Sequence, residues 1–500
     1  MSYPLFYLFV MKHILLLLGL LTGLAIHAQR TDIVPLIHTQ WGQGSPYNLL
    51  CPTIAGQHCQ TGCVATAMAQ VMKYHEWPKA DFQWDKMLNL YDCEATEGER
   101  IAVAQLMASC GEAVSMEYGL TTSAAWEGDA AVALREVFGY APSVREVFRN
   151  MYGRTAWENL IYHELSQGRP VFYGGMPSGF AHQFVCDGYA DGKFHFNMAW
   201  QYLSDGYYIV DELDLYPEGQ TAIIGIQPAC DEDFGKEFTL GTLTYTVTDK
   251  GEVSVRMNKE NPPVGKLNIP ASVEWEGNTY RVTAIDYAAF EDCTTLTALH
   301  IPASVAVIGN RMVLGCTQLV SIDVDAANLW YLSQDEVLMG KNELVSYPIS
   351  KSTSTYCVPD GITAIPASFF RSNTYLQHIE LPASVQSVDI LAFRDCSALT
   401  TIVTHNPSPR TIEELAFDDD TYATATLIVP AGTATQYKRL GGWKRFQHIE
   451  ENASTNFISP PSFWPSSNSF LPLFPSSSYP FFVDLQTGKK YLFSFRNEKN

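Results

Sequence analysis

The sequence predicts two parts, an α+β domain in the first half of the chain and a solenoid of short repeats in the second half. Three observations support this prediction. A glycine followed by a cysteine opens a strongly apolar helical pattern at residues 63–75, and two short strands follow a stretch of small residues near residue 180. From about residue 238, short strands recur with a step of 23 residues. A chain of 500 residues is long enough for two or three domains.

A buried helix is predicted to begin at Cys63. Its apolar side chains recur at helical spacing, at Val64, Ala67, Met68, Val71 and Met72. Trp77-Pro78 closes the pattern. A thiol at a helix N-terminus faces unpaired backbone N–H groups and the positive end of the helix dipole, and both favour the nucleophilic thiolate. Gly62 permits a sharp turn and leaves room for an approaching substrate. Cys63 is therefore the candidate nucleophile, and the alternative is an inert buried cysteine.

His182 is the candidate base that takes the thiol proton. It follows a loop of small residues, 174–179, and begins an apolar strand that ends at residues 187–188. A second strand, 194–197, follows a turn, so the two strands are predicted to pair as a hairpin. Asn197 then lies on the strand beside His182, where its side-chain carbonyl can accept from the ring N–H and fix the tautomer.

Gln57 is the candidate oxyanion donor, because it lies six residues before Cys63 and its amide can act together with the Cys63 backbone N–H. Two other histidines compete with His182 as the base. His75 lies roughly 18 Å from Cys63 at 1.5 Å per helical residue, whereas spacing does not exclude His195. Each candidate also has a structural alternative, as a hydrogen-bonded strand residue, a strand-end cap or a solvated loop side chain.

Residues 33–228 resemble the streptopain family of bacterial cysteine peptidases, which have a papain-like fold. The segments that carry the resemblance are residues 34–43, 46–52, 61–75, 168–171, 181–189, 204–208 and 223–228. The resemblance implies that Cys63 is the nucleophile, His182 the base and Gln57 the oxyanion donor, and it removes His195 as a rival base. Trp200 and Gly62 are expected on the substrate-binding side. The expected fold of residues 29–230 is an α+β papain-like catalytic domain.

The segment after the second strand departs from the family pattern. The family reads Asn-Trp-Gly-Trp-Gly-Gly, a tryptophan-rich wall beside the imidazole, whereas residues 197–202 read Asn-Met-Ala-Trp-Gln-Tyr. Asn197 and Trp200 are retained, and Met198, Gln201 and Tyr202 are changed. We expect the altered wall to affect turnover and specificity more than the type of reaction.

Residues 1–28 are predicted to be a secretory signal peptide. A positive segment at residues 11–13 precedes a leucine-rich apolar run that ends near Ala28, and Met11 is a candidate start. The apolar run is short for a stable membrane span, and an N-terminal membrane anchor is the alternative. The expected location is secreted, periplasmic or on the surface of a bacterial cell. Few residues separate this leader from Val34, so no large inhibitory pro-segment is expected, and any restraint on activity must come from elsewhere, including the C-terminal half.

The composition excludes several classes of binding partner and cofactor. The formal net charge is −21 with no basic patch, which argues against nucleic acid and anionic membrane surfaces. None of the eleven cysteines falls in a CxxC pair or a His/Cys cluster with metal spacing, so we expect no metal and no cofactor. Cys51 and Cys59 are a candidate disulfide pair in an exported chain.

Residues 236–450 are predicted to form a leucine-rich-repeat solenoid. Residues 301–305 read Ile-Pro-Ala-Ser-Val and recur in nearly the same form at 269–273 and 381–385. The set Phe290, Cys293 and Leu296 is followed 23 residues later by Val313, Cys316 and Leu319. A short strand in every unit of this length is typical of leucine-rich repeats, which stack to bury their apolar faces. The units resemble those of bacterial surface antigens, with an irregular linking unit at 325–366 and a terminal cap at 427–444.

The sequence therefore predicts an exported cysteine endopeptidase that acts on protein or peptide substrates through Cys63 and His182. The repeats are expected either to bind a host or surface protein or to serve as a stalk or docking platform. The main alternative is a repeat adhesin whose peptidase domain is impaired by the changes at Met198, Gln201 and Tyr202. Acyl transfer to an amine by the same thiol is a third possibility. Residues 453–500 are rich in Ser, Pro and Phe and are predicted to be a flexible tail.

Overall fold

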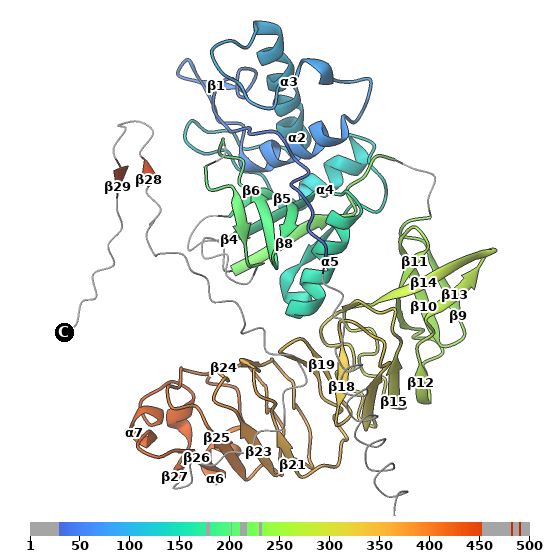
Figure 1. Ribbon diagram of the computed structural model, residues 1–500, viewed down its shortest axis with the longest axis vertical. Helices are drawn as coiled ribbons and strands as arrows, with labels where there is room; N and C mark the ends of the chain where they lie inside the picture. Colours follow the sequence, from blue (N-terminus) through green and yellow to red (C-terminus); the bar gives the residue numbers. More distant parts are fainter. Residues whose placement is uncertain are drawn as a thin grey trace, which may run out of the picture. The chain divides into compact units, whose positions relative to one another are not determined.

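The computed structural model describes residues 30–176, 181–201, 203–210, 218–229 and 233–452, together with two short strands, β28 (Phe482–Val483) and β29 (Lys490–Tyr491) (Figure 1). The chain up to Pro460 is one compact unit, and Pro461–Asn500 is a second. The predicted signal peptide and most of the predicted tail lie outside the described residues. Of the helices within these ranges, none combines the length and apolar character needed to cross a bilayer.

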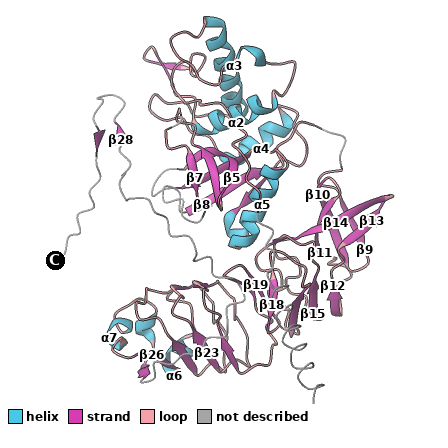
Figure 2. Cartoon of the chain, in the orientation of Figure 1, coloured by secondary structure: helices cyan, strands magenta, loops and turns pink. Residues whose placement is uncertain are grey.

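The first half of the chain is an antiparallel sheet with helices on both faces (Figure 2). The helices are α2 (Cys63–His75), α3 (Glu97–Ala113), α4 (Glu127–Glu136) and α5 (Arg154–Ser166), with the short 3-10 segments η1 (Trp84–Lys86) and η2 (Arg149–Met151). The strand order is β3-β8-β4-β5-β6-β7. Their bounds are β3 (Arg145–Phe148), β8 (Glu218–Ile224), β4 (Val171–Met176), β5 (His182–Ala190), β6 (Lys193–Asn197) and β7 (Gly206–Tyr208). A small hairpin, β1 (Thr53–Ile54) with β2 (Gln57–His58), precedes α2.

The two faces of the sheet bury different helices, because side chains alternate along each strand. Helix α2 is buried from Val64 to Met72 and packs with α3 and α4 against one face, which includes Val185 of β5. Helix α5 packs against the other face, which includes Phe184 of β5. The N-terminus of α2 and the start of β5 therefore meet inside the core of the domain.

The predicted helix and hairpin are both confirmed. Helix α2 begins at Cys63 and ends at His75, where Glu76 takes a left-handed conformation with φ 47°. Strands β5 and β6 pair antiparallel, with Asn197 opposite Val185 rather than opposite His182. The proposed disulfide is not present, because Cys51 and Cys59 are both free and buried.

The second half is the β-solenoid that the repeats predict. It begins with a sheet in which β13 (Ser272–Trp275), β14 (Asn278–Ile285), β11 (Glu252–Met257), β10 (Leu243–Asp249) and β9 (Glu237–Leu240) lie side by side, and β16 (Val307–Ile308) also pairs with β14. Parallel coils follow, in sheets β12-β15-β17 and β21-β23-β25-β26-β27. Their strands are β12 (Gly265–Asn268), β15 (Leu296–Ile301), β17 (Ser321–Val324), β21 (Thr355–Cys357), β23 (His378–Leu381), β25 (Thr401–Thr404), β26 (Thr426–Pro430) and β27 (His448–Asn452).

Two irregular parts of the solenoid coincide with the segments that the sequence singles out. The linking unit is an antiparallel meander of β18 (Leu332–Gln334), β19 (Val337–Gly340) and β20 (Glu343–Ser346). At the C-terminal end, β26 and β27 are accompanied by short helices, α6 (Asp419–Thr424), α7 (Ala434–Tyr437) and η4 (Trp443–Arg445). A second short parallel pair, β22 (Ala364–Ile365) with β24 (Ser387–Val388), lies on another side of the coils.

The repeated phenylalanines and cysteines have a common physical role. Neighbouring strands pair at a step of 23 residues, as in Ile379 opposite Ile402. Steps of 23 and 24 residues stack the rings of Phe370, Phe393 and Phe417, with centroids 4.8 and 4.6 Å apart. The thiol of Cys396 donates to the Phe370 carbonyl oxygen at 3.0 Å, so each recurring cysteine ties one coil to the coil before it.

Helix α5 is held by the repeats at both of its ends. The backbone N–H groups of Arg154 and Thr155 donate to the carboxylate of Glu343 at 2.7 and 3.0 Å, where a negative charge favours a helix N-terminus. Beyond the other end, Arg169 donates to Asp249 of β10 at 2.6 Å. The two halves of the chain therefore share this helix.

We expect Phe393→Ala to destabilise the repeats by about 3–5 kcal/mol, because it removes a fully buried ring from the centre of the stack. The free energy of unfolding is measured by urea denaturation followed by circular dichroism. Tyr375→Ala, at a ring that is 46% exposed, is the control and should change it little. Equal effects of the two substitutions would show that the ring stack does not stabilise the coils.

Candidate active site

Cys63 is the first residue of α2, and Gly62 before it has φ 85°. This left-handed conformation suits glycine. A Cβ atom at Gly62 would also lie 2.7 Å from Met116 Sδ, so close packing requires glycine here independently of any substrate. The role of Gly62 in substrate binding stays a prediction.

The thiol of Cys63 is under opposing influences. The thiol is half-buried against the core, and this burial raises its pKa because the charged thiolate is poorly solvated there. Hydrogen bonds from the main chain of Gln183, Val64 and Cys63 itself act in the opposite direction, and the negative charge of Glu127 adds to the rise. Burial prevails, so the pKa lies above its usual value. The helix terminus alone is therefore not enough to make the resting thiol a thiolate.

His182 opens β5 with a ring that is almost fully buried. Its Nε2 lies 2.9 Å from the carbonyl oxygen of Met198. Because a carbonyl only accepts, Nε2 must carry the proton, and Nδ1 is left as the basic nitrogen. Trp200 stacks on the imidazole with centroids 4.5 Å apart. Burial lowers the pKa of His182 to about 4, against a smaller rise from the Met198 carbonyl, so the imidazole is neutral at neutral pH.

The Cys63 thiol lies at the start of β5, beside the residue that follows His182. Gln183, whose main chain faces the Cys63 sulfur, directly follows His182 in the sequence. The structure thus brings the predicted nucleophile and the predicted base to the same end of β5. Trp200, which the sequence places on the substrate side, covers one face of the imidazole ring.

Asn197 has different partners from those predicted. Its Nδ2 donates to the Thr39 carbonyl at 2.8 Å, and its Oδ1 accepts from Gln70 Nε2 and from the Ala199 backbone N–H, both at 3.1 Å. The acceptor for the ring N–H of His182 is instead the Met198 carbonyl. A sequence motif reveals only which side chains are present. A backbone carbonyl that accepts the ring N–H of a histidine can belong to any residue and cannot be recognised from the sequence.

Gln57 lies in β2 of the hairpin before α2, and its side chain is exposed. The structure records no contact between this side chain and Cys63, and the role of Gln57 as oxyanion donor stays a prediction. The rival histidines have other partners. His75 Nδ1 lies 3.3 Å from the Tyr140 hydroxyl, and His195 Nδ1 lies 2.6 Å from the carboxylate of Asp187.

A polar cluster beside the thiol is not evident from the sequence. Glu127, the first residue of α4, accepts from the side-chain amide of Gln183 and from the hydroxyl of Thr221 at 3.0 Å. Gly174 makes room for this amide, because a Cβ there would lie 2.2 Å from Gln183 Oε1. An acidic residue in a first helical turn ordinarily indicates favourable interaction with the helix dipole, so its sequence position does not reveal this contact.

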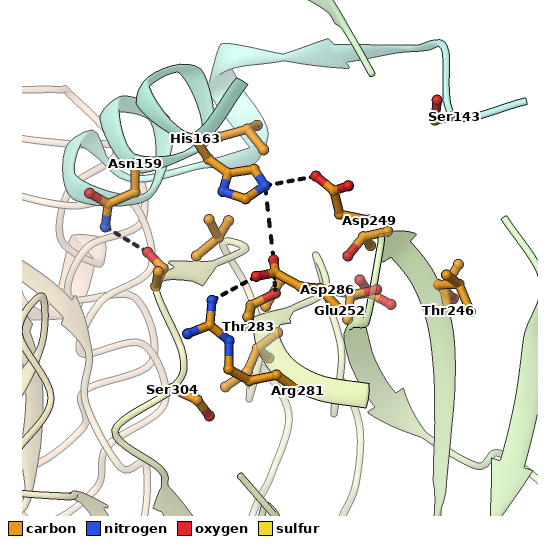
Figure 3. A pocket seen from close by; sticks show the side chains of 18 of the residues that line it. Ser143, Asn159, His163, Thr246, Asp249, Glu252, Arg281, Thr283, Asp286 and Ser304 are labelled. Atoms are coloured by element: carbon orange, nitrogen blue, oxygen red, sulfur yellow. Dashed lines mark hydrogen bonds and ion pairs between the residues drawn. The ribbon is translucent and has the colours of Figure 1, made fainter. Parts of the chain in front are cut away.

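A cavity of about 490 Å³ lies between α5 and the first repeats and is not the site of Cys63 (Figure 3). His163 of α5 contacts Asp249 at 2.9 Å, and Arg281 donates to Glu252 at 2.6 Å. The first pair joins α5 to β10, the second lies within the repeats between β14 and β11, and no residue of α2 or β5 lines the cavity. Across the ranges that the structure describes, no group of His, Cys, Asp and Glu side chains is arranged to hold a metal ion.

Comparison with known proteins is consistent with this geometry. The family model "Peptidase C10 family" matches residues 41–81 and 79–208. The model "BspA type Leucine rich repeat region" matches residues 277–336 and 347–463 in six copies. Streptopain of Streptococcus pyogenes is 34% identical over 240 residues, which cover 38% of this chain and 60% of streptopain. The thiol protease/hemagglutinin PrtT of Porphyromonas gingivalis is 30% identical over 289 residues, which cover 48% of this chain and 33% of PrtT.

Among solved structures, the active wild-type interpain A cysteine protease of Prevotella intermedia is 32% identical. The match covers 39% of this chain and 95% of interpain A, with a TM-score of 0.38. The family models show that this chain contains a streptopain-like peptidase C10 domain. Its C10 domain contains Cys63 and His182, and BspA-type leucine-rich repeats follow. The chain spans about three fifths of the length of the streptopain that it matches.

We expect His182 to titrate with a midpoint near pH 4, because burial disfavours the imidazolium and lowers the pKa from the usual value of 6.5. The midpoint is read from the ring proton resonances of the histidines in NMR spectra, and His182→Ala identifies the resonance. A midpoint at or above 6.5 would mean that an opposite charge, such as a Cys63 thiolate, outweighs burial.

Proposed function

We propose that this chain is an exported cysteine endopeptidase that hydrolyses protein substrates through Cys63 and His182, with the repeats as a binding or docking domain. Two observations support the proposal: the thiol at the N-terminus of α2 lies at the main chain of Gln183, the residue that follows His182, and the Nε2–H of the His182 imidazole is held by a carbonyl. This arrangement leaves Nδ1 as the base, which a thiol nucleophile requires.

The proposed reaction begins with a neutral pair. Cys63 Sγ attacks the peptide carbonyl while His182 Nδ1 takes the thiol proton, so that the thiolate forms as the bond forms. The Met198 carbonyl favours the imidazolium produced in this step. The backbone N–H of Cys63, together with the predicted donor Gln57, stabilises the oxyanion. The imidazolium then protonates the leaving amine, and water hydrolyses the thioester.

The surroundings of His182 support a shielded proton transfer. Trp200 covers one face of the imidazole, and Phe184 lies on the same strand with its ring centroid 5.7 Å away. An apolar enclosure strengthens the hydrogen bond to Met198 and keeps water from competing for the ring N–H. We propose that Trp200 also contacts substrate at the open side of the site.

A specific observation supports a second candidate function, a repeat adhesin with an impaired peptidase domain. Burial raises the pKa of Cys63 and lowers that of His182, so the resting pair carries no charge. A pair that stays neutral when substrate arrives would be a poor catalyst. Labelling by an epoxide thiol-protease inhibitor at neutral pH separates the two functions. Rapid labelling of Cys63 that is lost in His182→Ala indicates a peptidase, and slow labelling independent of His182 indicates the adhesin.

We expect Cys63→Ala and His182→Ala each to lower casein cleavage by at least about 10³-fold, because nucleophile and base act as a unit. Cleavage is measured under reducing conditions with the chain from residue 29. Cys93→Ala, at an exposed cysteine outside the site, is the matched control and should retain activity. Proteolysis that survives either substitution at the site would refute the assignment.

A further inference from the structure

The orientation of the His182 ring depends on the backbone of Met198, and two side chains hold that backbone. The α carbon of Met198 joins two peptide groups. One contains the Met198 carbonyl and the Ala199 N–H, and the other contains the Met198 N–H. Peptide groups are planar, so a hydrogen bond that fixes one end of a peptide group fixes the direction of its other end.

The first peptide group is held from the side opposite His182. Its carbonyl oxygen accepts from His182 Nε2 at 2.9 Å, and its N–H, on Ala199, donates to Asn197 Oδ1 at 3.1 Å. In a trans peptide these two groups point in opposite directions. Asn197 therefore helps to aim the carbonyl at the imidazole without touching the ring.

The second peptide group is held by Asp205. Its N–H, on Met198, donates to Asp205 Oδ1 at 2.7 Å, which is typical of a hydrogen bond to a charged acceptor. Asp205 lies just before β7, and its half-buried carboxylate is close enough to His195 for the two charges to interact. Rotation of the first peptide group would carry the Met198 carbonyl away from the ring, and the second group holds the Met198 α carbon from which that carbonyl extends.

The backbone around this point needs such anchors. Ala199 and Gln201 both have left-handed φ values, 57° and 53°, which side-chain-bearing residues adopt at a cost. The Gln201 N–H donates to the Trp41 carbonyl at 3.2 Å, which holds the far end of the turn. The Met198 side chain is fully buried and fixes the centre. Among these anchors, Asp205 is the one with an ionisable side chain.

We propose that Asp205 is a positioning residue of the C10 site, whose carboxylate holds the Met198 backbone so that the Met198 carbonyl orients the His182 imidazole. The inference rests on the proposed peptidase function for its kinetic consequences. Its structural consequence, the protection of the His182 ring N–H, is independent of activity.

The experiment compares Asp205→Ala, which removes the accepting oxygen, with Asp205→Asn, which keeps an accepting oxygen and removes the charge. One measurement is the NMR resonance of the His182 Nε2 proton at neutral pH, identified by its absence in His182→Ala. A hydrogen bond to Met198 protects this proton from exchange with water. The other measurement is kcat and KM for peptide cleavage. Asp81→Ala, at an exposed aspartate of the same domain, is the control.

We expect Asp205→Ala to lose the protected resonance and to lower kcat by about tenfold or more, with KM changed by less than about twofold. Asp205→Asn should keep the resonance and stay within about threefold of the wild-type kcat. If Asp205→Ala does not fold, Asp205→Glu takes its place with the same expectations, because it keeps the charge but displaces the accepting oxygen by one methylene group.

A resonance and a kcat that are unchanged in Asp205→Ala, or in Asp205→Glu where that variant is used, would overturn the proposal. Equal losses in the alanine and asparagine variants would overturn it as well, because they would assign the effect to charge rather than to the hydrogen bond. If the wild-type chain cleaves nothing but the resonance responds as expected, the peptidase function fails and the positioning role of Asp205 stands.

Discussion

The packing of the N-terminus of α2 against the first residues of β5 is the contact on which the candidate site depends. It places the Cys63 sulfur at the main chain of Gln183, the residue that directly follows His182 in the sequence. The contact holds because α2 is buried almost along its whole length and Val185 of β5 belongs to the same core. The chemistry of the site is thus supported by the apolar packing of one helix on one sheet.

The same packing sets the electrostatics. Burial raises the pKa of the Cys63 thiol and lowers that of the His182 imidazole, so the resting pair is neutral. The hydrogen bond to the Met198 carbonyl and the backbone N–H groups at Cys63 favour the charged forms, but they do not outweigh burial.

The repeats are attached to the C10 domain through α5. Glu343 caps its first turn, and Asp249 binds Arg169 and His163 near its other end. Helix α5 also forms the core of the sheet face opposite α2. A single helix therefore links the face of the sheet behind the site to the first coils of the solenoid, so the repeats are part of the packing of the domain and not only an appended module.

The sequence by itself determined the elements with strong local patterns. The apolar periodicity after Cys63 predicted that α2 begins at this residue, and the 23-residue step predicted the solenoid, because most neighbouring coils pair their strands at that spacing. Cys63 and His182 were candidates because each begins an element with a clear apolar pattern, and the family resemblance selected His182 over His195. Tertiary structure alone decided the rest. The ring of His182 is held by a backbone carbonyl, Asn197 acts on that backbone rather than on the ring, and Glu127 reaches Gln183 across the fold. Some of these contacts join residues that are distant in the sequence, and others involve backbone atoms. Local sequence patterns carry no information about either kind of contact.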